Sequence, residues 1–164
     1  MTALTPLRAR TIETPIGSLT LAGDDRLRYL LMVDQAHAPD RSGWRADPSG
    51  FDDVVEQLDA YFAGELRSFD VVVEMRGTDF QRTVWRGLCD IPYGETWSYA
   101  ELAAHIGRPT AVRAVGAANG RNPVSIIVPC HRVIGASGTL TGYGWGVERK
   151  RWLLEHESGA SPLL

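Results

Sequence analysis

The chain has 164 residues, of which 44% are hydrophobic, which is enough for a buried core in one domain or in two small ones. No apolar run approaches the roughly 18 residues that span a bilayer, and residues 1–10 lack the continuous apolar segment of an export signal. We therefore expect a cytoplasmic globular protein with no membrane partner, in which Cys89 and Cys130 are free thiols.

The formal net charge of −3 argues against a nucleic-acid partner, but the distribution of charge argues for one. Residues 1–77 carry 8 Lys and Arg against 13 Asp and Glu, whereas residues 78–164 carry 9 against 7. Within residues 99–134 a single acidic side chain, Glu101, opposes a basic stripe made of Arg108, Arg113, Arg121 and Arg132. Such asymmetry indicates a polyanionic partner. The alternative is that scattered arginines merely solvate one face.

The chain begins with the pattern of a β-meander. Three strands are predicted, over residues 9–13, 18–22 and 27–33. A turn at Thr14-Pro15-Ile16-Gly17 and an acidic turn at residues 23–25 connect them.

The rest of the first half predicts a loop, a helix and one more strand. Residues 35–50 are rich in Asp, Pro, Gly and Ser and are expected to form the loop. Apolar residues at helical spacing predict a helix over residues 51–63 that stops at Gly64, and residues 71–75 predict the strand. Helical patterns follow from there, so we place the domain boundary at residues 76–78.

The second half opens with a predicted helix over residues 79–89, capped by Thr78 and ended by the Ile91-Pro92-Tyr93-Gly94 segment. Cys89 is expected to be a core residue under this helix. Next, Ser98 and Glu101 have the spacing of a capping box, which opens a helix that Gly107 closes.

A further helix is predicted over residues 110–119, with Pro109 in its first turn and Gly120 at its stop. Together with the helix before it, it forms a helix-turn-helix candidate; the alternative is a mere packing unit. Arg113 and Asn119 are its main polar side chains, and most of its other residues are Ala, Gly and Val. This composition suits DNA binding without base readout, or docking on another helix.

The segment Pro129-Cys130-His131-Arg132 sets a thiol, an imidazole and a guanidinium side by side after an apolar run, residues 124–128, that predicts a strand. A thiolate is the nucleophilic form of cysteine, and nearby cations or hydrogen-bond donors stabilise it. Neighbouring residues on a strand point to opposite faces, so a Cys-His pair requires the chain to turn, and Pro129 favours a turn. A buried, inert cysteine is the alternative.

Glycines recur over residues 135–146, interleaved with threonines and with Tyr143 and Trp145. This composition predicts a shaped loop whose backbone approaches a ligand closely, with Tyr143 as an apolar wall of the site. A final helix is expected over residues 147–156, with residues 152–154 packing inward. Glu157 at its end could orient a histidine from another segment or simply be solvated.

These motifs together resemble a known family, the O6-alkylguanine-DNA alkyltransferases. The resemblance rests on Pro129-Cys130-His131-Arg132-Val133-Ile134 with Arg113-Ala114-Val115-Gly116, Asn122-Pro123, Gly142-Tyr143, Trp152-Leu153-Leu154 and His156-Glu157. It spans residues 78–159 and extends more loosely through the hairpin at residues 14–17. The resemblance implies an α+β protein: residues 1–77 form a ribonuclease-H-like accessory domain with a sheet and a helix, and residues 78–164 form a helical, winged helix-turn-helix-type DNA-binding domain that carries the active-site cysteine.

The family implies that Cys130 accepts the alkyl group from O6 of guanine, and also from O4 of thymine, in duplex DNA. His131 would draw the proton from Cys130 through an ordered water while Glu157 holds the imidazole. Asn122 would brace the segment beneath the site.

The resemblance also implies the residues that meet DNA. The damaged base must be flipped out of the duplex. Arg113 would fill the vacated stack, and Tyr99 would bear on the flipped nucleotide and its 3′ phosphate. The pocket would be lined by backbone groups of Val133 and Gly144 and by Tyr143, with Arg132 and Asn119 as further contacts.

A thioether product leaves nothing to hydrolyse, so the family implies one turnover per protein and no cofactor. We predict no metal, because residues 1–77 contain only His37 and no cysteine, unlike the family's zinc-binding members. We expect a monomer, with cooperative binding on DNA left open. Trp145 is expected to narrow the pocket against bulky adducts.

Two other functions are compatible with parts of this pattern. The first is a non-catalytic lesion-binding module of the same family, which lacks the acceptor cysteine; Cys130 argues against it. The second is a cysteine hydrolase that turns over repeatedly, which the Arg113 helix argues against.

Overall fold

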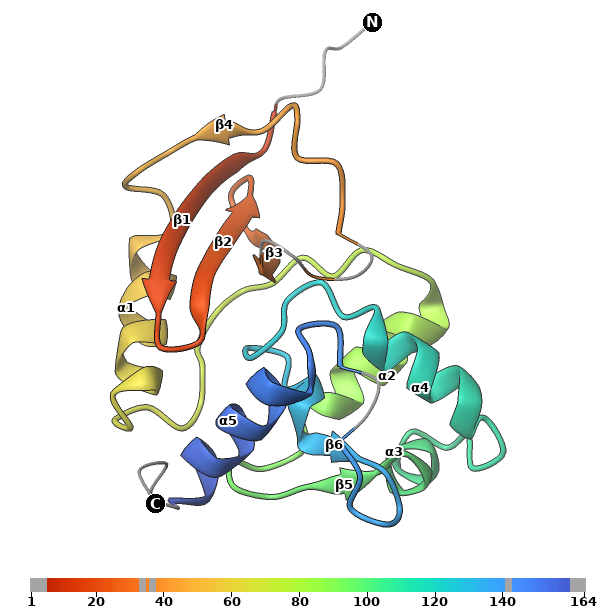
Figure 1. Cartoon of the computed structure of the whole chain (residues 1–164). Helices are drawn as coiled ribbons and strands as arrows, with labels where there is room; N and C mark the ends of the chain where they lie inside the picture. The colour runs from red at the N-terminus through yellow and green to blue at the C-terminus, as the bar shows by residue number, and fades with distance from the viewer. Residues whose placement is uncertain (1–5, 33–34, 36–37, 141–142, 160–164) are drawn as a thin grey trace, which may run out of the picture. The chain divides into compact units, whose positions relative to one another are not determined.

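The structure is a computed structural model that describes residues 6–32, 35, 38–140 and 143–159. The chain divides into two compact units that meet between Glu74 and Met75. Figure 1 shows a sheet with one helix in the first unit and a mainly helical second unit.

The first unit is built on a four-stranded sheet with the strand order β3-β2-β1-β4. The strands are β1 (Arg8–Thr14), β2 (Gly17–Gly23), β3 (Leu27–Met32) and β4 (Arg45–Ala46). The three predicted meander strands are present, although Val33 lies outside the described residues. The hairpin between β1 and β2 is tight because Thr14 Oγ1 donates to the Gly17 carbonyl at 2.7 Å and Gly17 adopts a φ of 117°, which glycine tolerates best.

The helix α1 (Asp52–Phe62) lies alongside this sheet (Figure 1). It buries Val54, Leu58 and Tyr61, and the sheet contributes a fully buried row that includes Leu19 and Leu21. The periodicity of the helix and its end before Gly64, which has a φ of 79°, are as predicted.

Two predictions for this unit are wrong. The expected loop over residues 35–50 contains β4, which pairs in parallel with the start of β1. The expected strand over residues 71–75 is absent: a single bridge joins Leu27 to Val73, with Glu74 N donating to Leu27 O at 2.9 Å. One bridge cannot propagate a ladder, and Val72 is 65% exposed, so β-branched residues here lack a surface to pack on.

The second unit contains four α-helices among the described residues: α2 (Asp79–Leu88), α3 (Tyr99–His105), α4 (Val112–Gly120) and α5 (Val147–Ser158). The predicted capping box of Ser98 and Glu101 is present at α3, and the predicted cap Thr78 forms a capping box with Gln81 at α2. Two short parallel strands, β5 (Trp97–Ser98) and β6 (Val133–Ile134), hold the start of α3 beside the segment that follows Cys130.

The helices α2, α3 and α4 pack on one another around Trp85, Leu88, Leu102 and Val115, all of which are buried. Trp85 Nε1 donates to the Ala118 carbonyl at 2.8 Å and so joins α2 to α4. Gly87 lets α2 and α3 approach closely, because a Cβ there would lie 2.7 Å from Ile106 Cγ2. This packing places the helix-turn-helix pair on a rigid base.

Two predictions at the ends of helices are also wrong. Cys89 is exposed rather than in the core, because Val84, Trp85 and Leu88 already occupy the inner face of α2 and residue 89 follows about 100° further round. Pro109 precedes α4 instead of lying in its first turn: residues 108–111 form a separate turn, with Ala111 N donating to Arg108 O at 2.9 Å.

Candidate active site

Cys130 lies directly after a tight turn and not at the end of a strand. The apolar residues 124–128 fold back on themselves: Val128 N donates to Val124 O at 2.9 Å, and Ile126 takes a φ of 76°. The predicted strand is therefore wrong, because both ends of the segment are held by one side chain. Asn122 Oδ1 accepts from Val124 N at 2.9 Å, and Asn122 Nδ2 donates to Val128 O at 2.7 Å.

A 3₁₀ turn, η1 (Cys130–Arg132), follows Pro129, and all three of its residues are buried. Cys130 is 3% exposed and His131 is fully buried. Ser125 Oγ lies 3.5 Å from Cys130 Sγ. The chain thus turns at the point where a Cys-His pair requires it to turn.

His131 and Arg132 both reach the same carboxylate on α5. His131 Nε2 lies 2.6 Å from Glu157 Oε2. Arg132 donates twice to Glu157, from Nε to Oε1 at 2.8 Å and from Nη2 to Oε2 at 3.1 Å, and its Nη1 donates to the Ile91 carbonyl at 2.7 Å. Glu157 is 5% exposed, so it is part of this cluster and is not a solvated helix end.

The charges in this cluster fix the form of the imidazole. Burial alone would raise the pKa of Glu157, but hydrogen bonds and positive charge from His131 and Arg132 outweigh it and hold the pKa at about 2. Burial lowers the pKa of His131, an effect that the Glu157 hydrogen bond only partly offsets. A neutral imidazole beside a carboxylate carries its proton on Nε2, which leaves Nδ1 as an acceptor. Within the described part of the chain, His131 Nδ1 has no hydrogen-bond partner.

Burial raises the pKa of the Cys130 thiol, so the resting side chain is protonated at neutral pH. Hydrogen bonds from Ser125 and Asn122 and the charge of Lys150 act in the opposite direction. The site therefore combines a deeply buried thiol with groups that favour its anion.

Lys150 is a member of the site that the sequence analysis missed. It is completely buried on α5, and its Nζ donates to the Val133 carbonyl at 2.6 Å. Residues 150, 153 and 157 lie on one face of the helix, with Leu153 between the two charged residues. That stripe, charged at both ends, was the available signal, because a lysine on an inward face is rarely buried without a purpose.

Three of the predicted DNA-contacting residues, Arg113, Tyr99 and Asn119, lie on α3 or α4. Arg113 is exposed on α4, as are the small residues Ala114 and Ala117. Tyr99 begins α3 and is half-buried; a Cβ on Gly116 would come within 3.8 Å of its ring. Burial raises the pKa of Tyr99, and the charge of Cys130 acts in the same direction.

Other predicted contacts lie deeper. Asn119 is 1% exposed, and its Nδ2 points to the Cys130 carbonyl at 3.4 Å. Val133 is fully buried, and its carbonyl already accepts from Lys150. Tyr143 and Gly144 are half-buried in the loop before α5, while Gly142 lies outside the described residues. Trp145 is 3% exposed and meets the Tyr143 ring edge-on at 6.0 Å.

The predicted basic stripe is wrong for Arg132. Its side chain is 8% exposed and engages Glu157 and Ile91, so its charge is neutralised inside the unit and does not face a polyanion. Arg108, Arg113 and Arg121 remain exposed.

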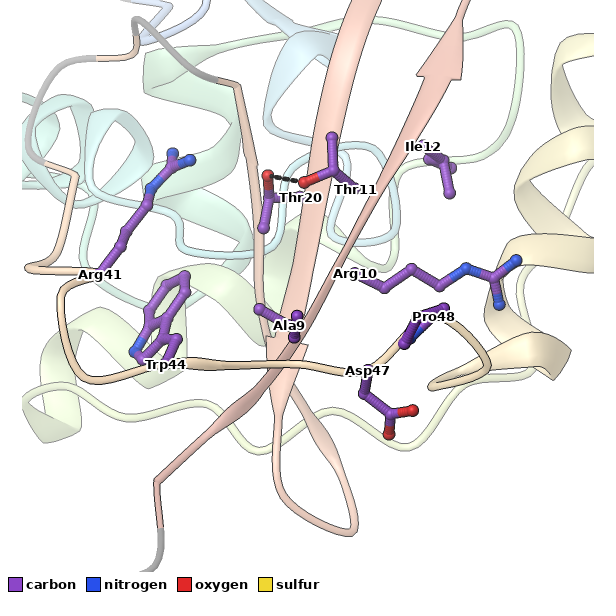
Figure 2. A pocket seen from close by; sticks show the side chains of 10 residues that line it. Ala9, Arg10, Thr11, Ile12, Thr20, Arg41, Trp44, Asp47 and Pro48 are labelled. Atoms are coloured by element: carbon purple, nitrogen blue, oxygen red, sulfur yellow. Dashed lines mark hydrogen bonds between the residues drawn. The ribbon is translucent and has the colours of Figure 1, made fainter.

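A separate hollow lies in the first unit, on the sheet beneath Trp44 and Arg41 (Figure 2). Several of its polar groups already have partners: Thr11 and Thr20 share a hydrogen bond of 2.9 Å, and Arg41 donates to the Met32 carbonyl at 2.7 Å. None of the residues predicted to act in chemistry lines it, so the cysteine site is the candidate active site.

Comparison with known proteins identifies the family of this chain. Family models of 6-O-methylguanine DNA methyltransferase match residues 7–75, as the ribonuclease-like domain, and residues 79–159, as the DNA binding domain. The chain belongs to the 6-O-methylguanine DNA methyltransferase family. A relative from Mycobacterium tuberculosis named methylated-DNA–protein-cysteine methyltransferase is 60% identical over 154 residues, which are 93% of each chain. One of the same name from Methanosarcina acetivorans is 52% identical over 149 residues, 88% of this chain and 94% of the relative.

Among solved structures, Mycobacterium tuberculosis OGT in complex with DNA is similar along nearly its whole length, with a TM-score of 0.91 and 60% identity over 94% of this chain and 95% of that one. The family assignment confirms the predicted α+β fold class with its N-terminal sheet domain and C-terminal DNA-binding domain. Members of this family repair DNA by direct reversal, in which the alkyl group moves from DNA to a cysteine of the protein.

The described residues were also compared with what a membrane-spanning helix and a metal site require. Among the described residues, no helix is both long and apolar enough to cross a membrane. Nor does the described part of the chain bring together three or more His, Cys, Asp or Glu side chains that could hold a metal ion.

Proposed function

We propose that Cys130 is the acceptor and that the protein removes alkyl groups from O6 of guanine, and from O4 of thymine, in duplex DNA, once per molecule. The observation that carries this assignment is the buried chain of contacts from Arg132 through Glu157 to His131, which ends beside Cys130. The second cysteine, Cys89, is exposed at the end of α2.

The proposed reaction is a single in-line displacement. Cys130 Sγ forms a bond to the alkyl carbon while the bond between that carbon and O6 breaks, and the electron pair of the broken bond stays on the base. His131 Nδ1 accepts the thiol proton through an intervening water and then releases it to solvent, and the departing guanine takes up one proton from solvent, so the charges balance. The product is a thioether on Cys130 and an unmodified guanine. No group in the site regenerates the thiol, so one protein repairs one lesion.

Arg132 has a different role from the one first expected. Its paired donors keep Glu157 ionised, and the carboxylate in turn keeps the His131 proton on Nε2. Arg132 is therefore a positioning residue for the base. Asn122 acts in the same way on the backbone, because it holds the turn that presents Cys130.

The α3–α4 pair is the proposed DNA-facing surface. Exposed Ala114 and Ala117 allow α4 to approach the duplex without selecting a sequence, which suits a protein that must find damage anywhere. Arg113 fills the stack that the flipped nucleotide leaves, and Tyr99 contacts that nucleotide and its 3′ phosphate. Flipping costs a few kcal/mol, roughly, and is cheapest at a damaged pair.

The pocket for the flipped base is assigned to Tyr143, to backbone groups of Val133 and Gly144, and to Asn119 behind the thiol.

We assign residues 1–77 to the accessory domain and residues 78–164 to the domain that binds DNA and accepts the alkyl group. The protein acts in the cytoplasm as a monomer and needs no cofactor or metal.

The decisive experiment uses duplex DNA carrying O6-methylguanine with a labelled methyl group. We expect at most one label per protein, recovered on the peptide that contains Cys130. Cys130→Ser should bind the same DNA and transfer nothing, whereas Cys89→Ser should behave like wild type. Repeated turnover would instead identify a recycling hydrolase, and label on Cys89 would overturn the assignment of the acceptor.

A second arm tests the DNA-facing helix. Arg113→Ala should slow repair of duplex DNA more than it slows reaction with a free O6-alkylguanine base, because only the duplex requires flipping. Equal losses with both substrates would remove Arg113 from that role.

A further inference from the structure

The turn before η1, residues 124–128, has a single polar side chain, Ser125. Ser125 is 5% exposed, and its Oγ makes a hydrogen bond of 3.5 Å with Cys130 Sγ. A hydroxyl that is removed from water without a hydrogen-bond partner costs free energy, so its partner inside the protein is informative. Here that partner is the sulfur atom that reacts in the proposed function.

The backbone, rather than a long flexible side chain, brings Ser125 to the sulfur. Ser125 and Val128 form a β-bridge within the turn, and Ile126 between them takes a φ of 76°. Cys130 N donates to the Val128 carbonyl at 2.8 Å, which ties the cysteine to the same turn. Asn122 holds both ends of the turn through its amide group. The hydroxyl is therefore held beside the thiol before any substrate binds.

The direction of this hydrogen bond depends on the state of the sulfur. In the resting thiol either atom can be the donor. Once His131 has drawn off the thiol proton, only Ser125 Oγ has a hydrogen to donate, and hydrogen bonds to ionised groups are about twice as strong as neutral ones. The thioether that forms after transfer is again a weak acceptor. The contact thus favours the thiolate over both the thiol and the product.

We propose that the Ser125 hydroxyl donates to the Cys130 thiolate and thereby increases the share of the protein that is in the nucleophilic form. Ser125 keeps its own proton throughout, and none of its covalent bonds forms or breaks. The thiol proton leaves towards His131, as in the proposed reaction. The inference deepens the proposed function and rests on Cys130 being the acceptor.

The electrostatics of the thiol agree with this geometry. Burial raises the pKa of Cys130, and the hydrogen bond from Ser125 is the largest of the effects that oppose it. Other polar and ionisable groups of the surrounding elements act in the same region, and the test must leave them in place. They are Asn122 from the turn, His131 and Arg132 from η1, Tyr99 from α3, and Lys150 and Glu157 from α5.

Two opposing effects set the size of the expected change. Loss of a hydrogen bond to an ionised group should lower the fraction of thiolate at pH 7 by about tenfold. A thiolate that is more basic is also more nucleophilic, which should offset about threefold of that loss. The observed reaction of Cys130 at pH 7 should therefore slow by only about threefold, while the thiolate itself becomes more reactive.

The test measures the thiolate without DNA, in a Cys89→Ser background. The ultraviolet absorbance of the thiolate, taken as the difference from Cys130→Ser, and the rate of reaction with iodoacetamide are followed against pH. Ser125→Ala should move the absorbance midpoint to higher pH and slow the reaction at pH 7 by about threefold. Ser137→Ala removes an exposed hydroxyl from the same unit and is the matched control, which should leave both curves unchanged.

The shape of the pH profile separates the hydrogen bond from a structural role. A variant that only disturbs the turn would react more slowly by the same factor at every pH and would keep the wild-type midpoint. Ser125→Thr retains the hydroxyl, so its midpoint should lie closer to wild type than to Ser125→Ala. A wild-type midpoint in folded Ser125→Ala, or equal midpoints in the alanine and threonine variants, would overturn the inference.

A further measurement requires no substitution at residue 125 and covers the case in which its variants do not fold. In the Cys89→Ser protein, the NMR signal of Ser125 Cβ should shift with pH at the same midpoint as the thiolate absorbance, because the hydroxyl becomes the obligatory donor there. A Ser125 signal that does not change across that transition would contradict the proposed contact.

The outcomes also separate this inference from the proposed function. If labelled methyl does not reach Cys130, the proposed function fails whatever the thiolate measurements give. If methyl transfer occurs but Ser125→Ala keeps the wild-type midpoint, only the role of Ser125 fails. If both hold, Ser125→Ala should slow methyl transfer from duplex DNA by about threefold and leave the affinity for that DNA unchanged, because the serine is buried.

Discussion

The two units of this protein use ion pairs for different purposes. In the first unit Arg10 pairs with Asp52, whose side chain is 72% exposed, and Arg8 pairs with Asp47 at the rim of the hollow. In the second unit Arg132, Glu157 and His131 form a chain in which the side chain of Glu157 is 1% exposed. Water screens the first set, so each pair contributes little. The second set is buried, so removing one partner leaves the other charges without compensation in a low-dielectric environment. The same residue types therefore control the protonation of His131 there.

The sharpest way to break this comparison is Glu157→Gln. The substitution leaves Arg132 without its buried counter-charge and no longer fixes the His131 proton on Nε2. We expect alkyl transfer to slow by at least about 100-fold and the free energy of unfolding to fall by about 3 kcal/mol. Single-turnover kinetics on a methylated duplex and urea denaturation measure the two effects.

Asp52→Asn is the control from the other unit. It removes a carboxylate from an exposed pair with Arg10, so the free energy of unfolding should change by less than about 1 kcal/mol and transfer should be unaffected. Similar losses for the two variants would show that burial does not distinguish the two sets.

The stability contribution of the buried Glu157 cluster should also depend on pH in the acid range. The pKa of Glu157 falls from its ordinary 4.5 to about 2 in the folded protein, so its contribution to stability is full above about 4.5 and is lost as pH falls towards 2. Integrated over that window the contribution is about 3 kcal/mol. Unfolding free energies of wild type and Glu157→Gln should therefore differ most near neutral pH and converge at the acid end. If the unfolding free energies of wild type and Glu157→Gln differed by the same amount at every pH in this range, the lowered pKa of Glu157 would be contradicted.

Sequence patterns predicted the elements whose signals are local. The cap at Thr78, the capping box at Ser98, the hairpin at residues 14–17 and the stripe of α1 depend on residues within a few positions of one another, and each is present. β4 was not predictable in this way, because its two residues are a strand only where β1 lies beside them.

The candidate site shows the same limit. Cys130, His131 and Glu157 were found because their types are distinctive, but the turn before them was misread as a strand from its β-branched residues. What overrides that local preference is Asn122, whose amide bonds to both ends of the turn. Lys150 was missed for a related reason: burial of a lysine depends on distant partners such as Val133, which composition does not reveal.

Asn122→Ala tests how much of the site depends on an uncharged clamp. The variant leaves Val124 N and Val128 O without their side-chain partner in a buried turn, so the free energy of unfolding should fall by about 2 kcal/mol. Transfer should slow because Cys130 is less firmly presented, whereas affinity for undamaged DNA should stay close to wild type. Thermal unfolding, transfer kinetics and a DNA-binding titration would check these results. A variant with full activity would show that the turn holds its shape without the clamp.

The smallest expected effect concerns the two tryptophans that flank a hollow or a pocket. Trp145 lies edge-on to Tyr143 beside the proposed base pocket, whereas Trp44 stacks on Tyr29 in the first unit at 5.5 Å. If the indole of Trp145 narrows the pocket, Trp145→Gly should raise the rate for O6-benzylguanine relative to O6-methylguanine by roughly tenfold, the scale of a shape change in an apolar pocket. The ratio of the two rates cancels any general loss of active protein. Trp44→Gly should leave that ratio unchanged, since its hollow belongs to the other unit; equal ratios in all three proteins would mean that adduct size is set elsewhere.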